Sequence, residues 1–145
     1  MALIARLAAH TQQICGLAWS PDNETFTTGG NDNTAYIFST KKVLNPDKRR
    51  TTNRSDNSAV TVRRVAPSNE QSQTMPTPAP SLPASTASHA IALNAAIKAL
   101  AYAPWTPSLL ALGAGSNDRG IHFHHTVSGS KLATIDCSAQ VTSLV

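Results

Sequence analysis

The chain has 145 residues, enough for one ordinary domain, and 41% of them are hydrophobic, so a core can form. Eight of the twelve basic residues fall between positions 41 and 64, so the formal net charge of +4 belongs to one segment and not to a folded basic surface. The sequence has no run of eighteen apolar residues that could span a membrane, and no signal peptide opens it. We therefore expect a soluble intracellular protein.

Residues 1–39 have the pattern of short antiparallel strands separated by tight turns, which is typical of a β-propeller blade of four strands. We letter the strands of a blade a to d in chain order. Strand a is predicted at 14–19, strand b at 25–28 and strand c at 34–38. Residues 3–7 would form strand d of a preceding blade.

Residues 40–87 have a different composition. They carry six of the nine prolines, many Ser, Thr and Asn residues, and almost no aromatic ones. Such a segment cannot bury enough apolar surface to offset the cost of ordering it. We therefore predict a disordered basic insert inside the first blade, followed by strand d of that blade at 88–93. Its Lys48-Arg49-Arg50 cluster fits a nuclear-import or polyanion-binding stretch, and it equally fits a solvated disordered run.

Residues 88–145 repeat the pattern of the first blade. ICGLAWSP at 14–21 and IKALAYAP at 97–104 align in register, 83 positions apart. Without the insert that spacing is about 40 residues, the length of one WD-type repeat. The strands of the second blade are predicted at 97–102, 109–112, 120–124 and 131–136, and 141–145 begins strand a of a third blade. The expected fold is all-β: about two WD-type propeller blades with partial flanking strands and a long disordered insert.

Cys15 and Cys137 both lie in or beside predicted strands. Two cysteines are too few for a disulfide framework. We therefore expect a pair of buried thiols in a reducing compartment.

Four strings contain residues that a generic repeat does not require. They are HTQQICGLAWSPDNETFTTGGNDN (10–33), NAAIKALAYAPW (94–105), GAGSNDRGIHF (113–123) and SAQVTSLV (138–145). In this order they resemble the middle blades of the Fizzy and Fizzy-related proteins, and the resemblance skips the insert. It implies a WD-repeat activator of the anaphase-promoting complex, a ubiquitin ligase, that delivers substrates carrying KEN-box and D-box degrons. The Ser- and Pro-rich insert favours a divergent, fungal meiotic member.

The turn between strands b and c carries an aspartate in WD repeats, which accepts hydrogen bonds from the turn backbone and from a loop histidine. Asp32 and Asp118 match that aspartate, and His10 is placed as the histidine of the first blade. The chain departs from the family pattern of Trp, Trp and His at Phe38, His124 and Leu93. We expect these departures to leave the hydrogen-bond network incomplete.

The resemblance also implies a degron-binding site on the top face of the propeller, built from polar side chains of several blades. Three positions match it: Asn31, Ser116 and Gln140. The topology supports them separately, because b–c turns and d–a loops emerge on the same face of a propeller. A plain turn-forming role for Asn31 is the alternative, since asparagine tolerates the left-handed backbone conformation. The ligase-binding motifs and the D-box groove of the family are expected outside this sequence.

Other classes of function find less support. His122, His124 and His125 have no Cys, Asp or Glu at metal-ligand spacing, so we expect no metal and no cofactor. A nucleic-acid binder needs aromatic residues or a folded basic face, and the insert offers neither. With no catalytic motif, we predict a non-enzymatic adaptor in the nucleus and cytoplasm. Its expected partners are subunits of the anaphase-promoting complex and degron-bearing substrates, without nucleic acid or membrane; the alternative is a generic WD-repeat scaffold.

Overall fold

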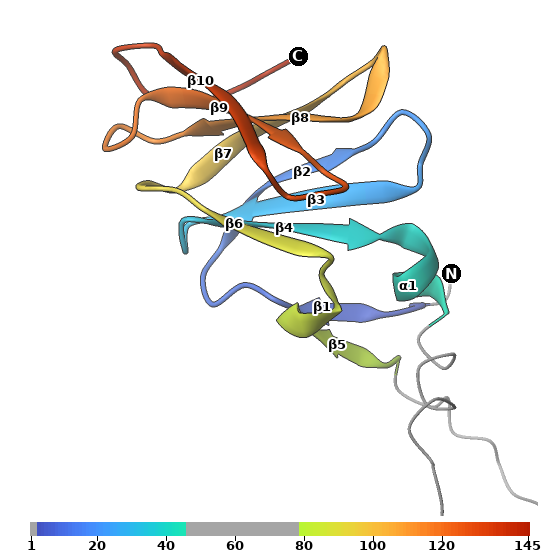
Figure 1. Ribbon diagram of the computed structural model, residues 1–145. Coiled ribbons are helices and arrows are strands. Elements are labelled where there is room, and N and C mark those ends of the chain that lie inside the picture. Colours follow the sequence, from blue (N-terminus) through green and yellow to red (C-terminus); the bar gives the residue numbers. More distant parts are fainter. Residues whose placement is uncertain (1–2, 46–78) are drawn as a thin grey trace, which may run out of the picture.

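The computed structural model describes residues 3–45 and 79–145, which form two stacked four-stranded antiparallel sheets and a small parallel sheet (Figure 1). The first sheet has the strand order β2 (Ile14–Trp19), β3 (Thr25–Gly30), β4 (Thr34–Ser39), β6 (His89–Ala92). The second sheet has the order β7 (Ile97–Ala103), β8 (Thr106–Ala114), β9 (Gly120–His125), β10 (Lys131–Asp136). Each sheet is thus an up-and-down meander, as the all-β prediction requires.

The insert predicted at 40–87 has regular structure at both ends, so the segment without it is shorter than the composition indicates. The helix α1 (Thr40–Leu44) follows β4 directly, and β5 (Ser81–Pro83) and a 3-10 turn (Ala84–Thr86) precede β6. These ends are ordered because a few apolar side chains pack on the first sheet: Val43, Ala84 and Ala87 lie against the cluster of Ala9, Phe26 and Phe38. The predicted disorder of 46–78 lies outside the described residues.

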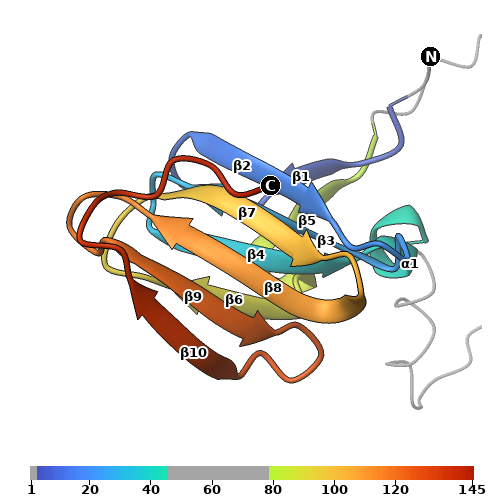
Figure 2. The same ribbon diagram turned by 90° about the horizontal axis from the view of Figure 1, so that it is seen from above.

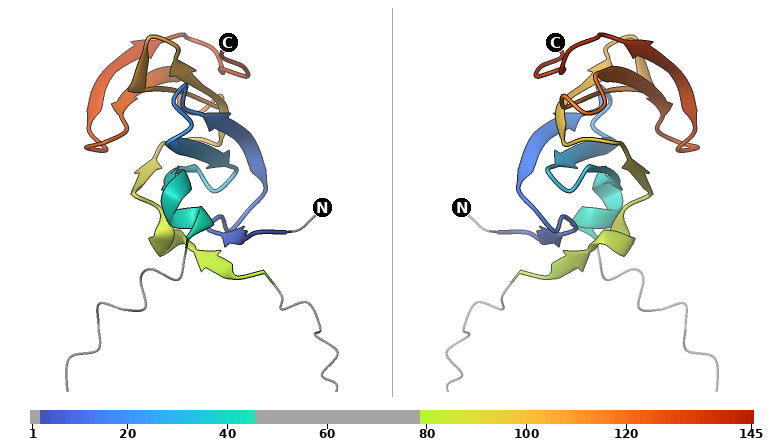
Figure 3. Two further views of the ribbon diagram at one scale, coloured as in Figure 1. Left: turned by 90° about the vertical axis from the view of Figure 1, so that its right-hand side faces the viewer. Right: turned by 90° about the vertical axis from the view of Figure 1, so that its left-hand side faces the viewer.

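The strand predicted at 3–7 lies at β1 (Arg6–Ala8), and its partner is unexpected. β1 pairs in parallel with β5, with Leu7 opposite Leu82. Both strands lie on the side of the first sheet that faces away from the second sheet (Figures 1 and 3). The ordered end of the insert, at β5, therefore holds the segment that precedes the first blade through strand pairing.

Residues 141–145 do not form the strand that their pattern predicts. Val141 is buried and its N–H donates to the carbonyl of Ala114 (3.0 Å), but residues 141–145 pair with no strand in the described part of the chain. A strand needs a partner for its backbone groups, so the apolar alternation alone is not sufficient.

The core lies between the two sheets and consists of aliphatic side chains from both. Its buried members are Ala35, Ile37, Ile91, Ile97, Leu110 and Leu112. Strand β7 packs on β2 and β3, as the view from above shows (Figure 2). A Cβ atom at Gly29 would lie 2.8 Å from Cγ2 of Ile97, so only glycine lets the two sheets approach this closely. Full burial of an Ile or Leu side chain contributes about 1.5–3 kcal/mol, so this interface holds the two sheets together.

The connections divide between the two ends of the sheets. The b–c turns and the d–a loops gather at one end, which we call the top face, and α1 lies at the other end (Figure 1). The insert predicted at 40–87 therefore begins at the end of the first sheet opposite the top face, where α1 lies.

The expectation of buried thiols is wrong, since both cysteines are exposed. Cys15 lies on β2, the first strand of its sheet, one face of which is uncovered, and Cys137 lies just beyond the end of β10. In the described part of the chain, no helix is long and apolar enough to cross a membrane.

Candidate functional site

The top face is held together by backbone hydrogen bonds between d–a loops and b–c turns. The N–H of Asn31 donates to the carbonyl of Gln13 (2.9 Å), and that of Leu93 donates to Asn33 (2.9 Å). The N–H of Gly115 donates in the same way to Ala96 (3.0 Å). These bonds join the d–a loops to the b–c turns, so that the top face forms one continuous surface.

The turn of the first blade is fixed by Asp32 and His10. Nδ1 of His10 lies 2.9 Å and 3.0 Å from the two carboxylate oxygens of Asp32, and Nε2 lies 2.8 Å from Oγ1 of Thr28. The N–H of Thr11 also donates to Asp32 (3.0 Å). Burial opposes ionisation of this carboxyl group, but the bonds from His10 and Thr11 outweigh it and lower the pKa of Asp32. Tyr36 packs edge-on against the His10 ring, with centroids 4.9 Å apart.

Phe38, at the position where the resemblance implies a Trp, serves only in packing. Phe38 is fully buried and stacks on Phe26 with ring centroids 5.3 Å apart. It has no N–H to donate, so the chain of hydrogen bonds from Asp32 ends at Thr28.

The turn of the second blade uses a histidine from a different place. Asp118 accepts a hydrogen bond from Nε2 of His122 (2.5 Å), together with the backbone N–H groups of Gly120 (3.2 Å) and Asn94 (3.3 Å). Burial again opposes ionisation, and these bonds outweigh it and lower the pKa of Asp118. His122 lies on β9, four residues after Asp118, where Tyr36 stands in the first blade.

Sequence reasoning missed this role of His122 because it looked for the partner in the d–a loop, where Leu93 stands. The available signal was the shared offset from the turn aspartate. Side chains four residues beyond that aspartate lie on the face of strand c that turns back toward it, so a histidine there can replace the loop histidine. Leu93 is released from that role and packs against the core.

His124 occupies the position that matches Phe38, six residues after the turn aspartate. Its side chain is buried, and neither ring nitrogen has a hydrogen-bond partner among the described residues. Burial lowers the pKa of His124 and outweighs the opposite effect of a weak backbone contact with Gly129, which falls short of a hydrogen bond, so the neutral ring is favoured. Among residues 3–45 and 79–145, no group of three or more His, Cys, Asp or Glu side chains could hold a metal ion.

A polar pocket of about 290 Å³ opens on the top face between the two blades. It is lined by Asn33, Asn94, Ala95, Ala96, Lys98, Gly115, Ser116, Asn117 and Gln140. The structure therefore brings together Ser116 and Gln140, which lie 24 positions apart in the sequence. Both are exposed, as are Asn33, Asn94 and Asn117.

Asn31 does not line this pocket. Its Oδ1 lies 3.1 Å from Sγ of Cys15, and its neighbour Asn33 supplies the pocket wall from the same turn. Asn33 has φ = 60°, the left-handed conformation that asparagine tolerates. Sequence reasoning missed Asn33 because residues two apart in a tight turn, unlike those in a strand, need not point to the same side, and the residue names alone do not show the direction.

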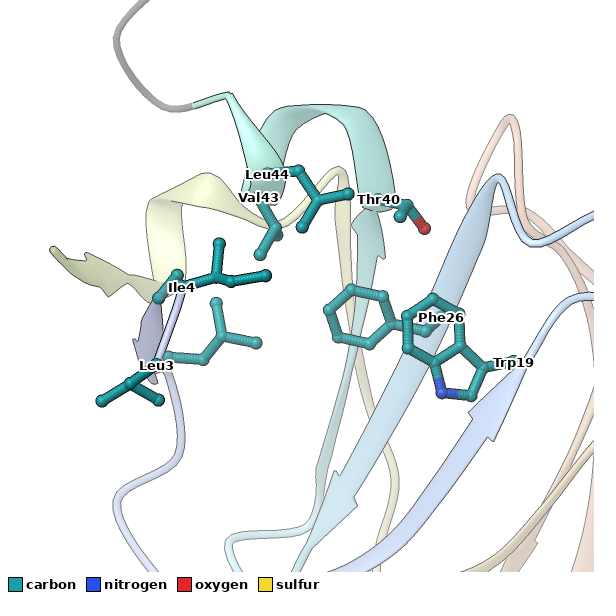
Figure 4. Close-up of a pocket in the computed structure, with 9 residues that line it drawn as sticks. Leu3, Ile4, Trp19, Phe26, Thr40, Val43 and Leu44 are labelled. Carbon is teal, nitrogen blue, oxygen red and sulfur yellow. The ribbon is translucent and has the colours of Figure 1, made fainter. Parts of the chain in front are cut away.

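Two further pockets are apolar and lie elsewhere. One of about 300 Å³ is formed by α1, the segment before β1 and the ends of β2 and β3, where Val43 and Leu44 face Ile4 and Phe26 (Figure 4). The other, also about 300 Å³, is on the second sheet and includes Trp105 and Phe123. Neither contains polar side chains that could orient a ligand by several hydrogen bonds, so we interpret both as packing surfaces.

Residues 1–39 match the family model "WD domain, G-beta repeat". Over 98% of its length the chain is 30% identical to the WD repeat-containing protein slp1 of Schizosaccharomyces pombe, of which it covers 21%. Over 94% of its length it is 30% identical to the meiosis-specific APC/C activator protein AMA1 of Saccharomyces cerevisiae, of which it covers 16%. In the crystal structure of a mitotic checkpoint complex, one chain matches 94% of this chain with a TM-score of 0.63 and 28% identity, over 29% of its own length.

The resemblance to the Fizzy family is confirmed, because a protein named FIZZY-RELATED 2 is among the relatives. The prediction of WD-type propeller blades is confirmed as well. The meiosis-specific activator among the Fizzy-type relatives fits the expectation of a fungal meiotic member. The chain spans about a fifth of the length of the curated relatives that it matches.

Proposed function

We propose that this chain is part of a non-catalytic substrate adaptor of the anaphase-promoting complex, and that it binds degron peptides on its top face through Asn31, Ser116 and Gln140. The observation that carries the proposal is the polar pocket between the two blades. Ser116 and Gln140 enter it from a b–c turn and a d–a loop, and the chain's Fizzy-type relatives include proteins named as APC/C activators.

The geometry of the pocket suits an extended peptide. Its lining combines exposed amide and hydroxyl groups with the small side chains of Ala95, Ala96 and Gly115. Small residues leave the backbone within reach, while amides donate and accept at once and can bind both the main chain and polar side chains of a ligand. Asn31 belongs to the same b–c turn as Asn33, and its Oδ1 accepts from Cys15, which leaves its side-chain NH2 group to donate to a longer peptide.

The remaining parts of the proposal follow from the family. The partners would be subunits of the anaphase-promoting complex and proteins carrying KEN-box or D-box degrons, without nucleic acid or membrane, and the protein would act in nucleus and cytoplasm. His10, Asp32 and Asp118 would serve the site indirectly, because their hydrogen bonds fix the two b–c turns.

Peptide titration of the full-length protein tests the proposal, with a peptide that carries a Lys-Glu-Asn motif and a scrambled version of it. Asn31→Ala, Ser116→Ala and Gln140→Ala should each weaken binding by about 1–3 kcal/mol, the cost of leaving a polar partner unsatisfied. Asn45→Ala is the matched control, since Asn45 is exposed and follows α1 at the opposite end.

The control variant and a deletion of 46–78 should both keep the wild-type affinity within about twofold. Equal binding of the Lys-Glu-Asn peptide and its scrambled version would refute the proposal. So would full affinity in all three top-face variants.

A further inference from the structure

Lys98 is the one charged residue among the described side chains that line the polar pocket. It lies on β7 between Ile97 and Ala99, which are both buried, so strand alternation directs its exposed side chain away from the core. The same residue also lines a second polar pocket of about 230 Å³, formed by β2, β7 and residues 142–144. Lys98 therefore lies at the top face, beside the packed strands β2 and β7.

The charge of Lys98 is not compensated within the described part of the chain. The ion pairs there join His10 to Asp32, Lys41 to Glu24, and His122 to Asp118. The turn carboxylate of the second blade, Asp118, does not line the pocket, and its oxygens already accept bonds from His122, Gly120 and Asn94. A ligand in the pocket would thus meet one positive charge surrounded by neutral amides and hydroxyls.

The backbone around Lys98 is held firmly. A Cβ atom at Gly16 would lie 3.0 Å from the carbonyl oxygen of Lys98 and would clash with the Leu100 side chain, so β2 packs directly on this part of β7. On its other side β7 pairs with β8, with Ala99 opposite Gly113. The ammonium group can move only within the reach of its own side chain, and Lys98 lines the same pocket as Ser116 and Gln140.

We propose that Lys98 binds an acidic side chain of the peptide in this pocket and makes the site selective for it. The inference rests on the proposed peptide-binding function and adds the chemistry of one ligand side chain. The ammonium group would donate a charge-assisted hydrogen bond to the carboxylate, while the Ser116 hydroxyl and the neighbouring amides donate to its remaining lone pairs. A solvated surface lysine would give no such preference.

The test uses two peptides that differ by one atom group. Their cores are Lys-Glu-Asn and Lys-Gln-Asn, both flanked by alanines, and they are titrated against the full-length protein. The wild type should prefer the glutamate peptide about tenfold, within the range of hydrogen bonds to charged groups. Lys98→Gln should remove that preference and leave the affinity for the glutamine peptide within about twofold. Lys98→Arg should retain the preference.

Lys131→Gln is the matched control, since Lys131 is exposed on β10 and lines no part of the pocket. It should leave the preference unchanged. Raising the salt concentration should reduce the preference in the wild type but not change Lys98→Gln.

The outcomes separate this inference from the function on which it rests. If Ser116→Ala weakens both peptides while Lys98→Gln leaves the glutamate preference intact, the role of Lys98 is wrong and the peptide site stands. If the wild type binds both peptides equally well, the selectivity is wrong. If neither peptide binds better than a scrambled one, the proposed function and this inference both fall.

Discussion

Replacement of His124 by phenylalanine should stabilise the second blade. His124 is 5% exposed, and both ring nitrogens are buried without a partner among the described residues. A buried polar group without a partner costs about 1–3 kcal/mol. The matching position of the first blade already holds Phe38, fully buried in the same kind of strand, so the larger ring fits this architecture. After an allowance for imperfect repacking, we expect His124→Phe to raise the unfolding free energy by about 1–2 kcal/mol at pH 7.5.

The pH dependence gives a sharper test than the size of the gain. Burial lowers the pKa of His124 below its ordinary value of 6.5 in the folded state. As the pH falls through 6.5, the unfolded chain binds a proton that the folded chain does not, so the free energy of unfolding falls. The slope is about 1.4 kcal/mol per pH unit until the lower folded-state pKa is reached. His124→Phe removes this loss.

The assay is urea unfolding of the full-length protein at pH 7.5, 6.5 and 5.5, in the wild type and in His124→Phe. The other histidines are present in both proteins, so the difference between their pH profiles isolates His124. His125→Phe is the control: His125 is half-buried and its Nδ1 lies 3.0 Å from Oγ of Ser128, so its loss should bring no gain. Parallel pH profiles for the wild type and His124→Phe would refute the reasoning.

Two further predictions concern the folding of the chain. Deletion of 46–78 should change the unfolding free energy by less than about 2 kcal/mol, since the entropy of loop closure depends weakly on loop length. Deletion of 40–87 should lower the unfolding free energy by roughly 2–5 kcal/mol, because it removes the buried side chain of Leu82, 8% exposed, and the contacts of Phe38 with the insert ends. Equal urea midpoints for the two deletions would show that the ordered ends contribute nothing. The isolated 145-residue chain should fail to unfold cooperatively, because its outer faces expose side chains such as Trp105, 78% exposed, that a propeller would cover. A sharp thermal transition with dispersed amide resonances from that chain alone would contradict this.

The strands were predictable because turn signals bound them. Strand a of the first blade was expected at 14–19 and lies at Ile14–Trp19, and the Pro21-Asp22 turn that follows directly fixes its C-terminal end. β8 begins three residues earlier than expected, at Thr106, because pairing with Ala103 extends the hairpin past the apolar run. Local turn chemistry thus fixes an element better than hydrophobicity does.

The ends of the insert could not be predicted from composition. The average composition of 40–87 hides its few apolar residues, and one buried apolar side chain is enough to order the end of such a segment. Leu82 is such a residue: it is buried beside Leu7 in a parallel pair that joins positions far apart in the sequence. The burial of the cysteines was misjudged for a related reason, since strand alternation shows which residues share a face and not whether that face is covered.

The candidate site shows the same division between local and long-range information. The family resemblance identified Ser116 and Gln140, and they do line one pocket. Lys98 was invisible to motif reasoning because a lysine on a strand is usually a solvated residue. Only the packing of β2 against β7 places it between the turns of two blades.

The two blades hold their turn aspartates with histidines from different elements, and this difference decides which loop residues can line the pocket. In the first blade the d–a loop supplies His10 to fix Asp32, so that loop is committed to the turn. In the second blade His122 of β9 holds Asp118, and the preceding loop contributes only the N–H of Asn94 to the same carboxylate. The side chain of Asn94 is then free to line the polar pocket beside Lys98. Moving the histidine from the loop to the strand keeps the turn in place while it leaves the loop available for a ligand.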